Sequence, residues 1–253
     1  MRENDTAPFR IRDIPVALAL LTRLPVPRLR DEAFQRQAQA VWAFPLVGLV
    51  VGAIAASAAA LALAAGLPGA LAAGVFLALQ IILTGAMHED GLADTADGFW
   101  GGWSVERRLE IMKDSHIGTY GVLALVMSVG LRWLAISLVL ASSIWLLIAI
   151  AVASRLGLPA MMSALPRVRP GGLSDHVGTP PVLAAALSAG LGFVLLILIA
   201  GPATAPLILA TCLAVAFCAA IARAKIGGQT GDVLGATQQV TEIACLVMLA
   251  AMI

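Results

Sequence analysis

The residues best suited to chemistry lie in one acidic stretch, 87–98, with the sequence MHEDGLADTADG. Asp90, Asp94 and Asp97 stand at positions i, i+4 and i+7, so in a helix their carboxylates fall within roughly 60° of arc on one face. Carboxylates at this spacing repel one another by roughly 0.2–0.5 kcal/mol per pair. Oxygen ligands favour a hard ion such as Mg²⁺, which keeps several waters and bridges to substrate phosphates. The spacing therefore predicts a Mg²⁺ site, and the competing interpretation is a solvated acidic loop.

A second polar segment, 113–121, leads into the apolar run that follows the acidic stretch. Lys113 is suited to meet a phosphate as a point charge, and Asp114 to complete a metal site or to orient a nucleophile. Gly118 and Gly121 allow another backbone or a ligand to approach closely. A polar helix entrance without a chemical role is the alternative.

Two further segments are suited to an anionic substrate. The segment 227–232, GGQTGD, has the composition of a backbone-lined anion site, but it does not fit the G-x-x-x-x-G-K-[ST] phosphate loop, and an ordinary turn is equally consistent. Asp232 would join the acidic stretch if the helices pack side by side. The segment 166–173 is basic and bent, and its Arg167 could gather anionic substrate or act as a membrane anchor. His88 would point away from the carboxylates in a helix, and proton transfer is its candidate role.

The composition identifies an integral membrane protein. Of the 253 residues, 60% are hydrophobic and only 12% are charged, and the mean hydropathy is +0.94, whereas a soluble domain is about one quarter charged. The net charge of +1 argues neither for nor against nucleic acid, but the sequence has no Lys/Arg-rich run of the kind that binds nucleic acid, and no nucleic-acid partner is expected. The three cysteines, Cys212, Cys218 and Cys245, lie in apolar segments without metal-ligand spacing, which favours buried structural thiols.

The apolar runs predict an all-α, polytopic membrane helix bundle, folded as a single domain over 1–253. Each run approaches the roughly 20 residues that cross a bilayer. Residues 1–40 form a polar N-terminal segment, in which 14–24 is suited to a short interfacial helix. The connection 88–118 is the predicted active-site loop. About seven spans are expected, with boundaries that are soft at two of the turns: 41–65, 67–87, 120–140, 142–162, 181–200, 203–222 and 233–253.

The charges predict the orientation of the bundle. Of the 16 Lys and Arg residues, seven lie in residues 1–40, whereas the turns at 66–70, 141–143 and 201–206 carry no charge. The positive-inside rule then places the N-terminus and the long connections in the cytoplasm. All acidic residues except Glu242 lie in those connections. We therefore expect a multi-pass membrane protein with a cytoplasmic active site.

Two features inside the spans point to helix packing. Arg132 and Glu242 are ionisable groups at membrane depth, where they are costly unless paired, and a pairing between them is one hypothesis. Small residues recur at Gly48, Gly52 and Ala56, a stripe that lets helices approach closely. Packing within one chain and self-association to a homo-oligomer both use such a stripe.

Several long motifs, taken in order, carry a resemblance to one family. The chain resembles cobalamin synthase, or adenosylcobinamide-GDP ribazoletransferase, a bacterial membrane enzyme of corrinoid biosynthesis, over nearly its whole length. This resemblance implies that the membrane is the bacterial inner membrane. His116 stands where the family's pattern has Arg. The matching segments are Thr22-Arg23-Leu24-Pro25-Val26-Pro27, Phe44-Pro45-Leu46-Val47-Gly48, His88 to Gly98, Lys113-Asp114-Ser115, Ile117-Gly118-Thr119-Tyr120-Gly121 and Gly228-Gln229-Thr230-Gly231-Asp232-Val233-Leu234-Gly235-Ala236.

The resemblance implies a reaction and its cofactor. In that reaction the ribose hydroxyl of α-ribazole, or of its 5′-phosphate, attacks adenosylcobinamide-GDP, and adenosylcobalamin or its phosphate forms with release of GMP and a requirement for Mg²⁺. Displacement at a pyrophosphate suits a carboxylate-held metal at a membrane surface. We assign the residues accordingly: Asp90, Asp94 and Asp97 as metal ligands; Lys113, Asp114, Asp232 and His88 as catalytic; Arg23, Ser115, Gly118, Thr119, Thr230 and Arg167 as substrate-binding.

Two other functions are weaker alternatives. The Asp-Gly-x-x-Asp-x-x-Asp pattern is similar to the motif of membrane CDP-alcohol phosphotransferases, but that motif has Ala-Arg after Asp-Gly and longer spacings. A cation-coupled transporter would suit the intramembrane charges. Against it, the acids cluster in one cytoplasmic layer and not at mid-membrane.

Overall fold

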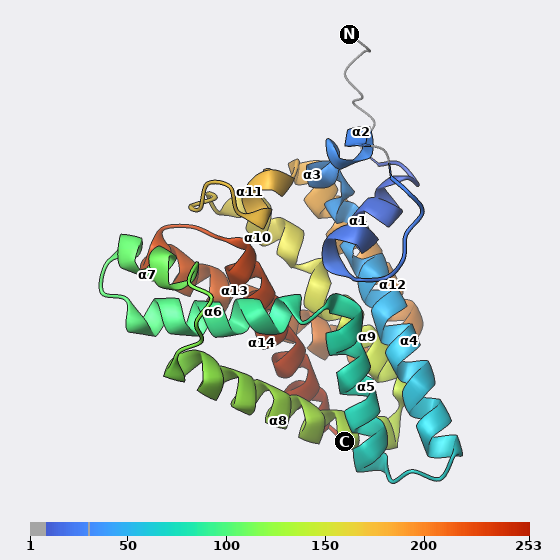
Figure 1. Ribbon diagram of the computed structural model, residues 1–253. Coiled ribbons are helices and arrows are strands. Elements are labelled where there is room, and N and C mark those ends of the chain that lie inside the picture. The colour runs from blue at the N-terminus through green and yellow to red at the C-terminus, as the bar shows by residue number, and fades with distance from the viewer. Residues whose placement is uncertain (1–8, 30) are drawn as a thin grey trace.

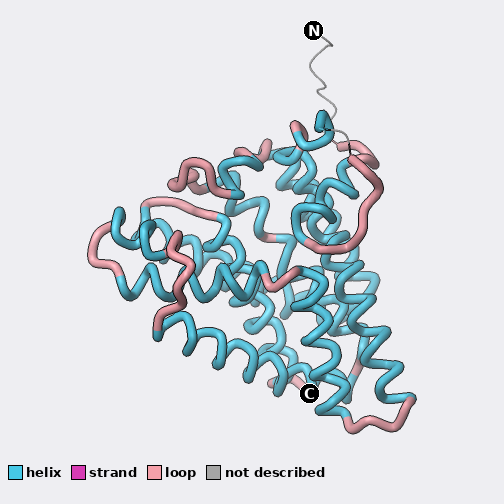
Figure 2. Tube along the Cα trace, viewed as in Figure 1, coloured by secondary structure: helices cyan, strands magenta, loops and turns pink. Residues whose placement is uncertain are grey.

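The computed structural model describes residues 9–29 and 31–253. Within these ranges the chain is helical apart from turns, loops and one isolated bridge between Arg167 and Gln229 (Figure 1, Figure 2). The all-α fold is therefore confirmed. The elements are α1 (Asp13–Leu21), α2 (Asp31–Phe34), α3 (Gln37–Ala40), η1 (Val41–Ala43), α4 (Phe44–Ala64), α5 (Gly69–Thr84), α6 (Met87–Gly101), α7 (Val105–Ile111), α8 (Thr119–Ser142), α9 (Ile144–Leu156), α10 (Leu158–Ala164), α11 (Leu173–Val177), α12 (Val182–Ala200), η2 (Gly201–Ala203), α13 (Thr204–Ile226) and α14 (Gly231–Ala250).

The membrane character is confirmed, but the number of spans differs with the way broken helices are counted. In the described ranges, 5 helical runs are long and apolar enough to cross a membrane, or 6 if the bent pair of α5 and α6 counts as one. One of these runs, Val182–Ile226, is 45 residues long and contains α12, η2 and α13. It is interrupted at Gly201, which has a φ of +53°. Seven spans remain a prediction.

The acidic stretch is a helix and not the predicted loop. At the end of α5 the chain turns by 84° through Gly85 and Ala86, which both have left-handed backbone angles. The next helix, α6, carries Glu89 and all three aspartates of the predicted metal site. Because such a density of acid is costly in hydrocarbon, we treat α5 as the spanning part and α6 as a helix outside the apolar layer.

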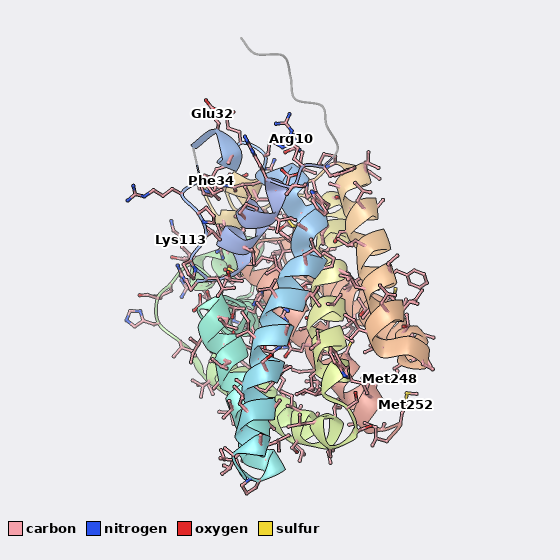
Figure 3. All side chains as sticks on the ribbon, turned by 90° about the vertical axis from the view of Figure 1, so that its right-hand side faces the viewer. Arg10, Glu32, Phe34, Lys113, Met248 and Met252 are labelled. Atoms are coloured by element: carbon pink, nitrogen blue, oxygen red, sulfur yellow. The ribbon has the colours of Figure 1, made fainter. Side chains whose placement is uncertain are left out.

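The polar and apolar ends of the molecule are separated as the charge pattern predicts. Arg10, Glu32 and Lys113 lie in the upper part of the molecule and Met248 and Met252 in the lower part (Figure 3). The uncharged turn between α4 and α5 and the C-terminus also lie at the lower end (Figure 1). Which end faces the cytoplasm stays a prediction.

The N-terminal region is folded onto the bundle. Helix α1 begins at Asp13, one residue before the predicted interfacial helix, and contacts α3 and α4. The buried Asp13 carboxylate accepts hydrogen bonds from Arg36 Nε at 3.2 Å and from Trp42 Nε1 at 2.9 Å. These bonds attach α1 to the start of the first long helix. Of the predicted N-terminal segment, residues 1–8 and 30 lie outside the described ranges.

The small-residue stripe of α4 is used inside the chain. A Cβ at Gly48 would overlap the backbone of Ala151 in α9, and one at Gly52 would lie 2.9 Å from the Ala151 Cβ. Glycine at both positions lets α4 and α9 pack backbone to backbone. A homo-oligomer stays an untested prediction. The prediction of buried thiols is wrong for Cys212, which is exposed on α13, and is confirmed for Cys245.

The intramembrane charges pair with each other, as one hypothesis from the sequence proposed. Arg132 on α8 is 1% exposed, and its guanidinium lies 2.7 Å from Glu89 of α6 and 3.0 Å from Glu242 of α14. Gln239 accepts a further bond from Arg132 at 2.8 Å. Three helices are thus joined through one guanidinium. A second arginine, Arg155, is buried inside α9 and donates to Ala151 O at 2.9 Å.

Candidate active site

Helices α6 and α14 approach closely because glycines face each other's backbone. A Cβ at Gly91 would lie 2.7 Å from the Asp232 carbonyl oxygen, and one at Gly235 would lie 3.3 Å from the His88 Cα. This contact brings Asp232 next to the face of α6 that carries Asp90 and Asp94. The sequence allowed that juxtaposition only on condition that the helices pack side by side, and the structure meets the condition.

The pKa of Asp94 shows the effect of the neighbouring carboxylates. Burial raises the pKa of Asp94, and the negative charges of Asp232 and Asp90 raise it further, to about 7. Arg169 acts in the opposite direction. A carboxylate held among other carboxylates in this way favours a bound proton or a cation.

Arg169 is the basic residue that reaches the carboxylates. Its Nη1 lies 2.6 Å from Asp232 Oδ2. The segment that carries it is held against the start of α14, because Gln229 N donates to Pro166 O at 2.8 Å and Val168 N to Gln229 O at 3.2 Å. The predicted substrate residue Arg167 is instead exposed and paired with Asp175 at 2.9 Å. The two arginines are two positions apart in one motif, so only the tertiary contacts distinguish them.

Asp97 has a different environment from the other two predicted ligands. Its Oδ2 accepts a hydrogen bond from Gly118 N at 2.7 Å and its Oδ1 from Gly121 N at 2.9 Å. These are backbone groups at the start of α8, where N–H groups lack helical partners. Asp97 therefore caps α8. Only glycine fits at positions 118 and 121, because a Cβ at either would overlap the Asp97 carboxylate.

In the part of the chain that the structure describes, no three His, Cys, Asp or Glu side chains converge closely enough to hold an ion, so a preformed metal cage is absent there. Asp90 and Asp232 are close enough to Asp94 to raise its pKa. Asp97 is hydrogen-bonded to the α8 backbone.

The segment before α8 is exposed. Asp114 accepts hydrogen bonds from His116 Nδ1 at 2.7 Å and from His116 N at 3.1 Å. The bond from the imidazole lowers the pKa of Asp114, and the carboxylate raises the pKa of His116. Lys113 and Ser115 are exposed, and Lys113 projects from the upper part of the molecule (Figure 3). Of the residues predicted here, Gly118 contacts the acidic helix through Asp97, and Thr119 begins α8.

Thr230 is part of the local structure of α14. The residue is buried and is the N-cap of α14, with its hydroxyl accepting from Val233 N at 3.3 Å and donating to Asp232 Oδ2 at 3.3 Å. The predicted anion site 227–232 is therefore a helix end, a short bridge and a helix start. Thr230 positions Asp232 and contacts no open space.

A polar cavity adjoins the acidic helix. It has a volume of about 510 Å³ and lies between α1, the bend from α5 to α6, and Leu173. Asp90 and Arg23 both line it, and the Arg23 side chain packs over Gly85 in the bend. The predicted substrate residue Arg23 and the predicted ligand Asp90 therefore face the same space.

The fold and the site define a class: a polytopic helical membrane protein with a cluster of carboxylates and arginines beside a polar cavity. Residues 13–250 match the family model of cobalamin-5-phosphate synthase. The chain is 45% identical over 246 residues to an adenosylcobinamide-GDP ribazoletransferase of Bradyrhizobium diazoefficiens, covering 95% of this chain and 94% of the relative. Relatives with the same name occur in Mesorhizobium japonicum, at 45% over 239 residues (93% and 92% covered), and in Brucella anthropi, at 41% over 251 residues (93% and 95% covered).

The chain belongs to the cobalamin-5-phosphate synthase family. The resemblance that the sequence motifs carry is therefore confirmed. No solved structure matches the chain.

Proposed function

We propose that the protein joins adenosylcobinamide-GDP to α-ribazole, or to α-ribazole 5′-phosphate. The observation that carries the proposal is the convergence of Asp90, Asp94 and Asp232 with Arg169 where α6 meets α14. In the reaction, the ribose hydroxyl oxygen bonds to the phosphorus attached to the cobinamide, the bond from that phosphorus to the GMP oxygen breaks, and the hydroxyl proton leaves. The family and the relatives' names support these substrates.

The carboxylates fit the expected Mg²⁺. Asp94 is surrounded by negative charge that a cation would compensate, and Mg²⁺ commonly uses one or two carboxylates together with waters and substrate phosphates. A complete protein cage is therefore not required. Asp90 and Asp94 would hold the ion, and the ion would neutralise charge on the phosphoryl oxygens.

The arginines bind and orient the substrate phosphates in this proposal. Arg169 is anchored by Asp232, so its guanidinium is held at the edge of the carboxylate cluster. Arg23 faces the polar cavity from the side of Asp90. Two cations around the reacting phosphates, of which Arg169 is held in place by Asp232, position the donor for in-line attack. Asp232 is the carboxylate that we assign to the hydroxyl proton.

The first experiment measures GMP release and adenosylcobalamin formation by detergent-purified protein. We expect both products in equal amounts, and only when adenosylcobinamide-GDP, α-ribazole and Mg²⁺ are all present. Asp94→Asn should abolish transfer. Arg169→Gln should lower kcat/KM about tenfold or more, because a charged hydrogen bond contributes about 1.5–3 kcal/mol.

Arg167→Gln is the matched control, since Arg167 is exposed and paired with Asp175. It should stay within about twofold of the wild type. Normal transfer by Asp94→Asn with unchanged Mg²⁺ dependence would refute the metal assignment. Release of a nucleoside monophosphate from CDP-alcohols alone would favour the phosphotransferase alternative.

A further inference from the structure

A second, apolar cavity shares a wall with the polar one. Leu20, Met87 and Leu173 line both. The remaining wall of the apolar cavity comes from α4, α10, α11 and α14, and includes Leu158 and Leu234. The volume of this apolar cavity is about 50 Å³.

Two polar side chains line this apolar cavity, and only one has a hydrogen-bond partner for its polar atom. The Ser174 hydroxyl donates to Gln229 Oε1 at 2.7 Å. His88 is 3% exposed, and its Nε2 is buried with no hydrogen-bond partner. Buried polar atoms are normally paired, and an unpaired one costs about 1–3 kcal/mol. The His88 Nε2 therefore has an unused hydrogen bond next to an apolar space.

The His88 ring lies among the apolar side chains that line this cavity. A neutral imidazole offers one donor and one acceptor nitrogen. It can make one hydrogen bond to an uncharged partner without bringing a charge into the cavity.

We propose that the apolar cavity holds the base of the acceptor nucleoside, with His88 Nε2 bonded to a ring nitrogen and the ribose in the adjoining polar cavity near Asp90. The inference rests on the proposed function. A planar, mostly apolar heteroaromatic base with one unsubstituted ring nitrogen needs apolar walls and a single hydrogen bond, and the cavity supplies both. Guanine needs several polar partners, and the corrinoid is far larger than the cavity.

The wall that the two cavities share sets the orientation of the acceptor nucleoside. A base in the apolar cavity leaves its ribose at the boundary formed by Leu20, Met87 and Leu173. Beyond that boundary lie Asp90 and Arg23. The attacking hydroxyl thus meets the phosphates on the side of the carboxylates, and His88 is a binding residue instead of the proton-transfer group expected from the sequence.

The first test fills the cavity. Leu158→Phe adds volume from α10, away from the carboxylates, and should raise KM for α-ribazole about tenfold while KM for adenosylcobinamide-GDP stays within about twofold. Ile221→Phe is the matched control, because Ile221 lines a different apolar cavity, of about 110 Å³, between α6, α13 and α14. It should change neither KM. Equal effects of the two variants, or an effect on the GDP substrate alone, would overturn the inference.

His88 variants test the hydrogen bond. His88→Leu should raise KM for α-ribazole about fivefold, and His88→Gln, which keeps a donor, should recover part of that loss. Since Nε2 has no protein partner, His88→Leu should not lower the thermal midpoint of the ligand-free protein. A lower midpoint with an unchanged KM would assign His88 a structural role and refute the proposal.

A competition measurement on the wild-type protein tests the inference even if the variants fail to fold. Free benzimidazole, a planar heteroaromatic base of the proposed chemical class, should compete with α-ribazole and not with adenosylcobinamide-GDP, whereas ribose should not inhibit. Inhibition that competes with the GDP substrate would contradict the inference. If the wild type forms no adenosylcobalamin at all, the proposed function itself fails; if it does and the base does not compete, only the present inference fails.

Discussion

At the scale of single residues, Asp94 is the group whose chemistry depends most on its surroundings. It is half-buried on α6 and faces Asp90 and Asp232. In an unfolded chain it would lose its proton near 3.8, whereas in the folded protein its pKa is about 7. Between these values the folded state binds more protons than the unfolded state, so a rise in pH favours unfolding.

Asp94→Asn should remove this pH dependence. In the absence of divalent cations, the variant should have a higher thermal midpoint than the wild type at pH 8, and the difference should shrink toward pH 4. Thermal denaturation in detergent across that range measures it. A variant that is less stable than the wild type at pH 8 would show that Asp94 makes favourable contacts as a charged group.

For other residues the sequence indicated a role from the residue type, but it did not reveal the group that each one contacts. Asp97 has the spacing of a metal ligand, yet both of its oxygens accept bonds from the start of α8. The partner backbone lies more than 20 positions along the chain, so helical spacing alone could not reveal it. Gly118 and Gly121 were correctly expected to allow close approach, and the approaching group is that carboxylate.

At the scale of elements, the buried ion pairs of Arg132 hold α6 in its orientation. Arg132 joins Glu89 of α6 to Glu242 of α14, and Glu89 directly precedes Asp90. A rotation of α6 would break the bond to Glu89. The ion pair between Arg132 and Glu89 therefore fixes the direction in which Asp90 and the acidic face of α6 point.

Arg132→Met should destabilise the protein by about 3–5 kcal/mol, because it leaves two buried carboxylates without their cation. Unfolding in mixed detergent micelles measures the change. The double variant with Glu89→Gln should recover much of the loss, since Glu242 then balances the charge of the buried Arg155. A double variant that is no more stable than Arg132→Met would show that packing around the side chain, and not its charge, matters.

The α5–α6 bend is the element that the sequence predicts least well. The apolar run 67–87 and the polar connection 88–118 were separated at nearly the right residue. The connection is nevertheless mostly helical, as α6 and α7. A strongly acidic segment has little apolar periodicity of its own, and its helix is stabilised by packing against α14 and α8.

At the scale of the whole molecule, the charged residues Arg10, Glu32 and Lys113 lie toward one end (Figure 3). The turn between α4 and α5 and the C-terminus lie at the other (Figure 1). We propose that the charged end is cytoplasmic in a bacterial inner membrane, as the positive-inside rule predicts.

Single cysteines in a background without Cys212, Cys218 and Cys245 test this orientation. Ser115→Cys should react with a membrane-impermeant maleimide only in inside-out vesicles. Leu67→Cys, in the turn after α4, should react only in right-side-out vesicles. The reverse pattern would place the carboxylate site outside the cell.

The sequence by itself determined the all-helical membrane class and the family, because apolar length, charge density and motif order are local properties of the chain. Only the tertiary structure decided which polar groups meet: Asp232 with Asp94, Arg169 and not Arg167 with Asp232, Asp97 with α8. These pairings arise where helices distant in sequence pack backbone to backbone at glycines such as Gly91. The depth and angle of such contacts depend on the whole bundle, so no local pattern specifies them.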